Sequence, residues 1–465
     1  MFKTTRRSAA RLAAAGVTAG LLAAGALATA GAAFADDVTP SSSGATAVLK
    51  GLEPGKYDRA VVDGNTSHSV YAGLFQMTVP GGGTIETYCI DFNHHTEDHA
   101  TYNEVAWGDS TLRGNPNAGK IAWILNNSYP KVDTAALAAT LKAGGINLDH
   151  PLTGALAAAG TQVAIWHLSD PGVKVQAADS DAKALSDYLD AHAQTLDEPK
   201  PSLSLEPAAV SGKSGDRIGP ITVHTTADSV DLSLGQGVPE GVKIVDESGK
   251  AVTTAKNGSK LYFQIPAGTD DGTTTVTVAA TTEIAVGRAF SATDKSSQSQ
   301  ILAGSDKTTV TAAASLSWAK KGPIPALSAK VVCADHGVDV TASNQGDEDF
   351  TFQLAGQNYT VAPGKSKTIT VPVAEDQKYK IDIKLPNGTV KTFEGVLDCT
   401  TATTTSPSTP TAAPSQAPQG GTGTNLAETG SSSATPVIAG VAVALVVLGG
   451  GAVFFVRRKK GSASH

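Results

Sequence analysis

The segments Tyr88-Cys89-Ile90-Asp91 and Thr161-Gln162-Val163-Ala164-Ile165-Trp166 decide the fold of the N-terminal part of the chain. The first follows apolar runs that are typical of strands, among them residues 70–79. The second lies between segments whose apolar residues recur at helical spacing, such as Ile121, Ile124 and Leu125, or Leu185 and Leu189. Strands that are followed by helices predict an α+β domain over residues 36–200.

Cys89 and Gln162 are residue types that can bond to each other. A thiolate can attack the glutamine carbonyl and expel ammonia, but an amide is a poor electrophile, so the fold must hold the two groups in contact. Effective molarities of roughly 10⁵ M or more make such a slow step feasible. The product is a thioester, an activated acyl group that must be kept dry. Apolar flanks suited to excluding water are supplied by Tyr88, Ile90, Phe92, Ile165 and Trp166.

Together the two motifs resemble the signature of thioester domains, which are modules of Gram-positive surface adhesins. The resemblance covers residues 36–200 and rests on Tyr88 to Asp91 and on Thr161, Gln162, Ala164, Ile165 and Trp166. It implies a β-sandwich or barrel with a helical insertion between the Cys89 strand and the Gln162 helix. It also implies covalent capture of a target nucleophile, with a lysine amine expected, by a single-use binding module that is not an enzyme and needs no cofactor.

The cysteine count agrees with a thiol that is consumed. Three cysteines are an odd number for an exported chain, and a spare thiol is exposed to oxidation outside the cell. Cys333 and Cys399 bracket one stretch rich in strand patterns, and we predict that they pair. Closing that loop would stabilise its domain by roughly 4 kcal/mol. Cys89 is left over, and a thioester would use up its thiol.

Cys89 and Gln162 each have an alternative interpretation without special chemistry. A lone cysteine such as Cys89 is usually a buried, inert thiol. Gln162 could be an ordinary surface residue at the start of an amphipathic helix, with Thr161 near the N-cap. Each alternative is strong alone and weakens when both motifs occur in one chain.

The nearby histidines suggest two further alternatives. A cysteine hydrolase would pair Cys89 with a histidine base, yet no Gly-rich oxyanion loop is near. A zinc site is conceivable from the spacing, although such a cluster is more often a polar loop, and no metal is predicted. The candidate bases are His94, His95, His99 and His167, and the candidate ligands are His94, His95, Asp98 and His99.

Short strands punctuated by turns fill the rest of the folded chain. Turn signals such as Asn257-Gly258 and Asp270-Asp271-Gly272 separate them. The pattern predicts an all-β Ig-like sandwich over residues 201–320 and a small all-β domain over residues 321–400. The Asp-rich turn lacks the spaced oxygen ligands of a calcium loop. No Lys to Asn isopeptide bond is predicted, because the strand at 308–313 holds no Asn.

Residues 1–35 have the layout of an export signal. A basic start with Arg6 and Arg7 precedes an apolar stretch that ends in the small residues Ala33 and Ala35. We expect cleavage between Ala35 and Asp36. The arginine pair leaves the general and the twin-arginine export routes open.

The C-terminal end combines three features in order. Leu426-Ala427-Glu428-Thr429-Gly430 precedes 20 uncharged residues (437–456) and a basic tail. Twenty residues rise about 30 Å as a helix, enough to span a bilayer. The pentapeptide resembles the sorting motif of sortase substrates, which implies cleavage after Thr429 and transfer to cell-wall peptidoglycan. A permanent membrane anchor is the alternative for the sorting signal at 426–465.

Composition sets the remaining limits. Residues 401–425 are nearly all Thr, Ser, Pro, Ala, Gly and Gln, which cannot bury a core and predict a stalk. A net charge of −7 without a basic block between the ends argues against nucleic acid as a partner. The resemblances therefore imply a wall-anchored surface adhesin with an unknown target. The alternative is a structural wall or coat protein whose thioester is inert or cross-links neighbouring chains.

Overall fold

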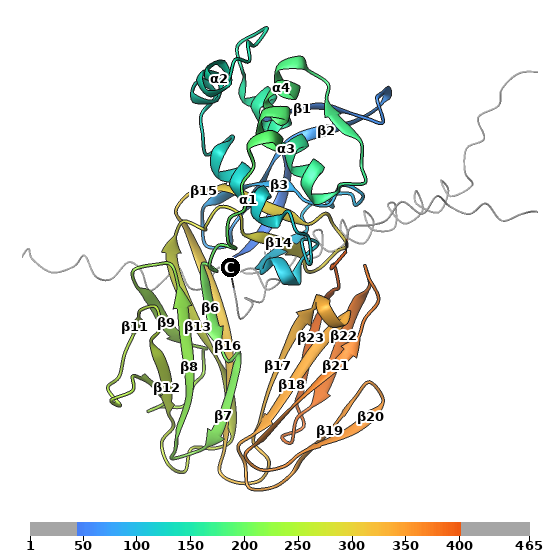
Figure 1. Cartoon of the computed structure of the whole chain (residues 1–465). Coiled ribbons are helices and arrows are strands. Elements are labelled where there is room, and N and C mark those ends of the chain that lie inside the picture. Colours follow the sequence, from blue (N-terminus) through green and yellow to red (C-terminus); the bar gives the residue numbers. More distant parts are fainter. Residues whose placement is uncertain (1–43, 401–465) are drawn as a thin grey trace, which may run out of the picture. The chain divides into compact units, whose positions relative to one another are not determined.

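The computed structural model of the protein describes residues 44–400 (Figure 1). The predicted export signal with its Ala35 to Asp36 cleavage site, the stalk, the sorting motif and the apolar span lie outside these residues. Across residues 44–400, no helix has both the length and the apolar character needed to cross a membrane.

The N-terminal part, here called the head, is built on a β-sheet that closes into a barrel. The strand order is β2-β3-β15-β14-β4-β1-β5, and the ring closes because β1 also pairs with β2. β1 reaches several partners since it is 17 residues long and bulges where it pairs with β2. The strands are β1 (Thr46–Val62), β2 (Asn65–Thr78), β3 (Thr84–Cys89), β4 (Thr101–Val105), β5 (Val175–Ala177), β14 (Ala289–Ala292) and β15 (Gln300–Ser305).

Helices from the same part of the sequence cover the barrel (Figure 1). α3 is the central one, because it contacts β1, β2 and β3 as well as α1 and α4. Gly160 lets α4 approach closely, since a Cβ at this position would lie 2.5 Å from the Ala182 carbonyl oxygen. The helices are η2 (Trp107–Asp109), α1 (Ala118–Asn127), α2 (Thr134–Ala143), α3 (Gly154–Ser169) and α4 (Ser180–His192).

The second part is a pair of β-sheets, here called the sandwich. One sheet has the order β10-β12-β8-β6 and the other β11-β9-β13-β16-β7. Alternating residues of the long strands are buried, which is the pattern of strands that cover a core on one face. The strands are β6 (Leu203–Glu206), β7 (Ala209–Lys213), β8 (Arg217–Thr225), β9 (Val230–Leu234), β10 (Lys243–Val245), β11 (Thr254–Ala255), β12 (Lys260–Gln264), β13 (Gly272–Thr282) and β16 (Thr308–Ala319).

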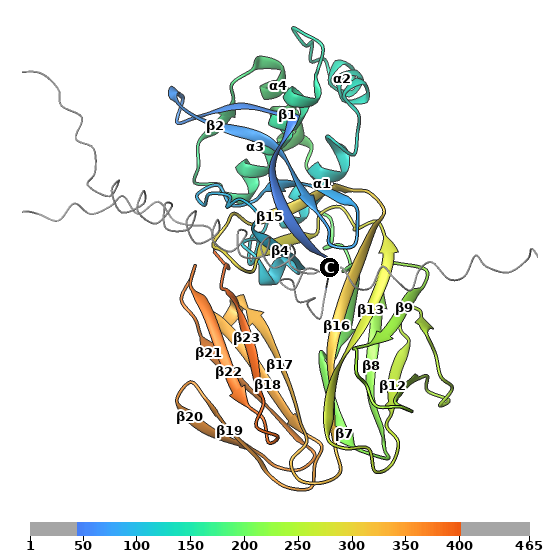
Figure 2. The same ribbon diagram turned by 180° about the vertical axis from the view of Figure 1, so that it is seen from behind.

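The sandwich and the head are interleaved in the sequence. β13 and β16 lie side by side along their whole length, from Gly272 opposite Trp318 to Thr282 opposite Thr308 (Figure 2). Between them the chain leaves the sandwich and adds β14 and β15 to the head barrel. The predicted boundary at residue 200 is therefore wrong as a limit of the head. The pattern of a strand shows which face is buried and does not show which sheet it joins.

A buried ion pair fixes this returning hairpin to the barrel. Arg288 Nε donates to Glu104 Oε1 at 2.7 Å, and Arg288 Nη1 donates to Glu198 Oε1 at 2.7 Å. The Glu104 carboxylate also accepts the backbone N–H groups of Ala45 and Ser202. Arg288 and Glu104 are 4% and 1% exposed. One buried carboxylate thus joins the start of β1, β4, the hairpin and the segment that enters the sandwich.

The third part follows β16 and has its own core around Val338, Val340 and Phe350. It contains the sheet β17-β18-β21 and the hairpins β19-β20 and β22-β23. Cys333 and Cys399 form a disulfide with an S–S distance of 2.07 Å, which joins η3 to the end of the folded chain. The elements are β17 (Pro325–Val332), η3 (Cys333–Asp335), β18 (Gly337–Asn344), β19 (Phe350–Leu354), β20 (Gln357–Val361), β21 (Lys365–Pro372), β22 (Lys378–Lys384) and β23 (Val390–Val396).

Candidate functional site

Cys89 and Gln162 meet in the interior of the head. Cys89 is the last residue of β3, Gln162 lies inside α3, and both are 0% exposed. The Cys89 backbone N–H donates to Gln162 Oε1 at 2.9 Å, and Gln162 Nε2 donates to the Cys89 carbonyl oxygen at 2.8 Å. This reciprocal pair fixes which side of the carboxamide is oxygen and which is nitrogen. The structure thus brings together the two residues that the sequence motifs single out.

The helix that carries Gln162 begins earlier than the alternative with Thr161 near the N-cap requires. Thr153 is the N-cap of α3 and accepts a hydrogen bond from the backbone N–H of Leu156. Thr161 is no cap, because it lies within the helix and its hydroxyl donates to the Ala157 carbonyl oxygen at 2.8 Å. The alternative in which Gln162 is a surface residue at a helix start is wrong. α3 is buried on every side around Gln162, so an amphipathic pattern cannot reveal its ends.

The Cys89 sulfur is enclosed by the backbone of Asp91. The thiol donates to the Asp91 carbonyl oxygen at 3.2 Å, and the Asp91 N–H points back to the sulfur at 3.3 Å. Burial, with the negative charge of Asp91, raises the pKa of the Cys89 thiol well above its usual range. The Trp166 indole acts on this pKa in the opposite direction and does not outweigh burial. Cys89 is therefore a neutral thiol at neutral pH.

The flanking motif residues divide into two groups. Phe92 and Trp166 form an edge-to-face pair with ring centroids 5.0 Å apart, and Trp166 belongs to the same apolar cluster as Cys89. Tyr88, Ile90, Ala164 and Ile165 pack in the other cluster of the head, among the helices. The Tyr88 hydroxyl donates to the Tyr129 carbonyl oxygen at 2.8 Å. Phe92 and Trp166 are thus the aromatic wall near the sulfur, and the other four orient β3 and α3.

Acidic side chains surround the motif, and sequence patterns did not single out most of them. Asp170 follows the last turn of α3, and its Oδ1 accepts the Phe92 N–H at 3.3 Å. Burial raises the pKa of Asp170 to about 6, so this carboxyl can exchange a proton near neutral pH. Asp91, which the motif does include, is 0% exposed, and its Oδ1 has no hydrogen-bond partner among residues 44–400.

The histidines are arranged neither as a metal site nor as catalytic bases. Across residues 44–400, no three His, Cys, Asp or Glu side chains are placed to hold a metal ion. His94 bonds to Asp91 and Asp376, while His167 bonds to Asp190 at 2.6 Å and to the Val175 carbonyl oxygen at 2.7 Å. Asp91 alone, in the part of the chain that the structure describes, makes hydrogen bonds to the Cys89 sulfur. The geometry therefore gives no support to a cysteine hydrolase.

Comparison with known families bears directly on this pair. Residues 86–195, which include both motifs, match the family model of the thioester domain. Within these residues the chain is similar to a thioester domain. Residues 324–396 match a second model, described as the bacterial phospholipase C C-terminal domain, which covers most of the third part. No curated protein matches the chain.

Solved structures similar to this chain include three described as TIE proteins or their thioester domains. The Bacillus anthracis TIE protein is 14% identical, with 77% of this chain and 82% of that chain covered and a TM-score of 0.26. The thioester domain of the Enterococcus faecium TIE86 protein is 16% identical, covering 61% and 99%, with a TM-score of 0.26. The thioester domain of the Staphylococcus aureus TIE protein is 14% identical, covering 59% and 98%, with a TM-score of 0.24.

Proposed function

We propose that this protein is a cell-wall-anchored surface adhesin that captures a target covalently through an internal thioester between Cys89 and Gln162. The reciprocal hydrogen bonds between the Gln162 carboxamide and the Cys89 backbone carry the proposal. Export and sortase attachment to peptidoglycan through Thr429 are proposed from the sequence of the two ends. In this role the sandwich and the third part are Ig-like spacers between the thioester and the wall.

Bond formation follows from the placement of the carboxamide. The Cys89 sulfur attacks Gln162 Cδ, a C–S bond forms, the C–N bond to Nε2 breaks, and the thiol proton leaves with the nitrogen as ammonia. The Cys89 N–H at 2.9 Å from Oε1 polarises the carbonyl and stabilises the negative charge that develops on this oxygen. The hydrogen bond from Nε2 to the Cys89 carbonyl oxygen keeps Cδ beside the residue that carries the thiol.

Storage of the thioester and capture of a target both depend on the burial of Cys89. Because burial penalises the Cys89 thiolate, expulsion of this sulfur as an anion is unfavourable, which slows the loss of the acyl group to water. When a target amine attacks Gln162 Cδ, a C–N bond forms, the C–S bond breaks, and one amine proton passes to the sulfur. The product is a Gln162 amide joined to the target and a regenerated Cys89 thiol. One domain captures one target, so we propose a binding module with no cofactor rather than an enzyme.

Intact mass tests the bond on residues 36–429, which contain every described element. Both proteins lose two hydrogens to the Cys333 to Cys399 disulfide, and we expect the wild-type chain alone to be lighter by a further ammonia, which Cys89→Ala should retain. Gln162→Glu is the closest control, because it has nearly the same shape and no ammonia to lose. A wild-type chain of full mass with a titratable Cys89 thiol would refute the thioester.

Labelled amine uptake tests the capture. Wild type should take up a labelled primary amine once per chain, and Gln162→Glu should take up none. Uptake that is equal in the two proteins contradicts capture at Gln162. Chain-to-chain adducts of wild type at high concentration, without uptake of free amines, would favour the alternative of a cross-linking wall protein.

A further inference from the structure

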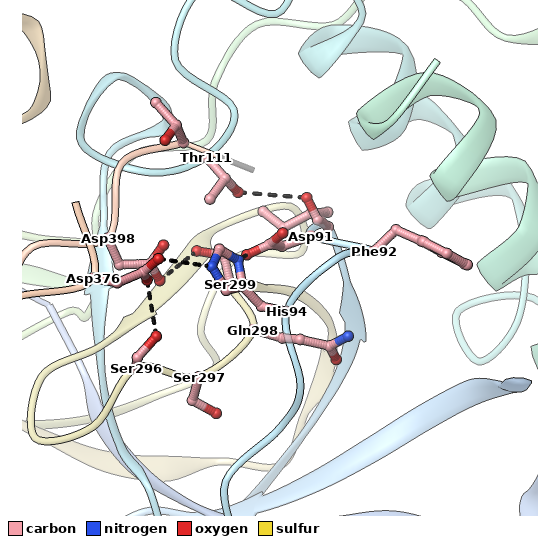
Figure 3. Close-up of polar contacts among 12 residues, drawn as sticks. Asp91, Phe92, His94, Thr111, Ser296, Ser297, Gln298, Ser299, Asp376 and Asp398 are labelled. Atoms are coloured by element: carbon pink, nitrogen blue, oxygen red, sulfur yellow. Dashed lines mark hydrogen bonds and ion pairs between the residues drawn. The ribbon is translucent and has the colours of Figure 1, made fainter. Parts of the chain in front are cut away.

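Three segments that are far apart in the sequence meet beside the Cys89 motif (Figure 3). They are the loop that follows Cys89, the connection between β14 and β15, and the third part of the chain. His94 Nε2 lies 3.1 Å from Asp376 Oδ2, Ser296 Oγ donates to Asp376 Oδ1 at 2.8 Å, and Ser299 Oγ donates to Asp398 Oδ2 at 3.1 Å. Beside the Cys89 motif, the third part therefore contacts the head through the two carboxylates Asp376 and Asp398.

His94 transmits this contact to the residue that encloses the sulfur. Its Nδ1 pairs with Asp91 Oδ2, while its Nε2 faces Asp376 (Figure 3). Hydrogen bonding to Asp91 raises the pKa of His94 to about 9, so the imidazolium ion lies between two carboxylates at neutral pH. Asp91 has no other side-chain partner in the described structure. Without His94, a fully buried carboxylate would stand uncompensated beside Cys89.

Ser299 provides a second connection to the same site. Its carbonyl oxygen accepts the Ile90 N–H at 3.0 Å, directly after Cys89, while its hydroxyl bonds to Asp398. Asp398 is 4% exposed and precedes Cys399 of the disulfide. The Ile90 backbone and the Asp91 side chain are thus each linked to the third part through one intermediate residue.

The third part holds its own side of the contact firmly. Asp376 occupies a left-handed turn with φ of 60° and donates its N–H to the Leu397 carbonyl oxygen at 2.8 Å. The neighbouring Glu375 accepts the backbone N–H groups of Cys399 and Thr400. The disulfide closes this unit, because it ties residue 399 to Cys333. The two carboxylates are therefore presented by a cross-linked element and not by a free loop.

We propose that the third part is a clamp on the thioester: Asp376 holds His94 and Asp398 holds Ser299, so that the backbone around the Cys89 sulfur stays closed to water. Asp376 and Asp398 are positioning residues, since they act through His94 and Ser299 and do not touch the sulfur. The inference rests on the proposed thioester and adds that the lifetime and reactivity of the stored acyl group depend on a domain outside the thioester fold.

The charges around His94 determine how the clamp depends on pH. The groups that face it are Asp91 on its own loop, Asp376 and Asp398 from the third part, and Asp170 at the end of α3. All four are acids and each favours the imidazolium form. Removing the Asp376 charge lowers the pKa of His94, so the clamp opens at lower pH than in wild type.

Asp376→Asn is the sharpest variant for a test. Asn tolerates the left-handed backbone at this position and keeps the shape of Asp. The substitution therefore removes the negative charge of residue 376 and changes little else. Asp382→Asn is the matched control, since Asp382 is an exposed carboxylate of the third part that accepts from the Thr392 hydroxyl. In both proteins the loss of the thioester to water is followed by intact mass between pH 6 and pH 10.

We expect Asp376→Asn to hydrolyse roughly ten-fold faster than wild type at neutral pH, with its pH profile moved to lower pH. Asp382→Asn should match wild type. His94→Gln should hydrolyse fast as well, and adding Asp376→Asn to it should have little further effect, because Asp376 acts through His94. The clamp is overturned if the thioester of Asp376→Asn hydrolyses at the wild-type rate at every pH. It is also overturned if the effects of the two substitutions on this rate are additive in the double variant. If the wild-type chain never loses ammonia, the proposed thioester itself is refuted, and this result differs from a failure of the clamp.

Discussion

Gln300 lies directly opposite Cys89 in the antiparallel pairing of β15 with β3. The Thr87 hydroxyl donates to Gln300 Oε1 at 3.0 Å, and the Ile90 N–H donates to the Ser299 carbonyl oxygen. The strand that carries the thiol is therefore completed by a strand that lies in sequence between β13 and β16 of the sandwich. A thioester site in this chain requires both.

Truncation at residue 200 should abolish the site, although both motifs would remain. Such a chain lacks β14 and β15, so β3 and β4 each lose a neighbour and the barrel cannot close. We expect no cooperative unfolding transition and no loss of ammonia by intact mass. Residues 36–400 are the control and should show both. A folded, ammonia-deficient fragment ending at residue 200 would show that β15 is dispensable.

Arg288→Met should destabilise the head strongly. The variant leaves Glu104 charged and buried, and breaking a buried pair in this way costs about 3–5 kcal/mol. Urea unfolding of residues 36–400 measures the change in free energy. Lys330→Met is a matched control, because Lys330 is 71% exposed and pairs with Asp109 at 2.9 Å, an ion pair worth about 1 kcal/mol or less. Equal effects of the two substitutions would contradict a structural role for the buried pair.

Asp398→Asn should stabilise the protein above neutral pH. Burial raises the pKa of Asp398 from 3.8 to about 7, so the folded protein holds a proton that the unfolded chain releases. This contribution to stability is complete below pH 3.8 and is lost as the pH rises through about 7. Asn has no charge to bury and can still accept from Ser299. The variant should gain on the order of 2 to 4 kcal/mol at pH 8 and little near pH 4. A gain that does not change with pH would contradict this assignment.

The sequence was informative where a residue's role depends on its neighbours in the chain. Tyr88 to Asp91 and Thr161 to Trp166 marked the two residues that the structure places in hydrogen-bond contact, because these two motifs resemble the signature of thioester domains. The Cys333 to Cys399 pairing followed from the odd cysteine count and the strands between them. The limits of α3 could not be predicted, since a helix buried on all sides has no polar face to define its register.

The pairing of strands and charges that are far apart in the sequence could not be predicted, for a physical reason. Residues 289–303 hold only two short apolar runs around a polar loop, and such runs fit strands of the sandwich as well as strands of the barrel. Similarly, nothing near His94 indicates that Asp376 is its partner, because ion pairs between distant segments leave no periodic signal. Arg288 directly before the apolar start of β14 is a local hint, since a charge that is drawn into a buried strand end needs a partner.

Phe92→Ala should shorten the life of the thioester without preventing its formation. Phe92 packs edge-to-face against Trp166 and is only partly buried, so it lies at the solvent side of the apolar cluster that contains Cys89. Its removal leaves Cys89 and Gln162 hydrogen-bonded and opens a path for water. The freshly purified variant should lack one ammonia and then gain the mass of water faster than wild type, as Gln162 becomes Glu. Phe393→Ala is the control, because Phe393 is a partly buried aromatic of the third part, and its loss should leave hydrolysis unchanged. A Phe92→Ala chain as durable as wild type would mean that Trp166 and Asp91 alone exclude water.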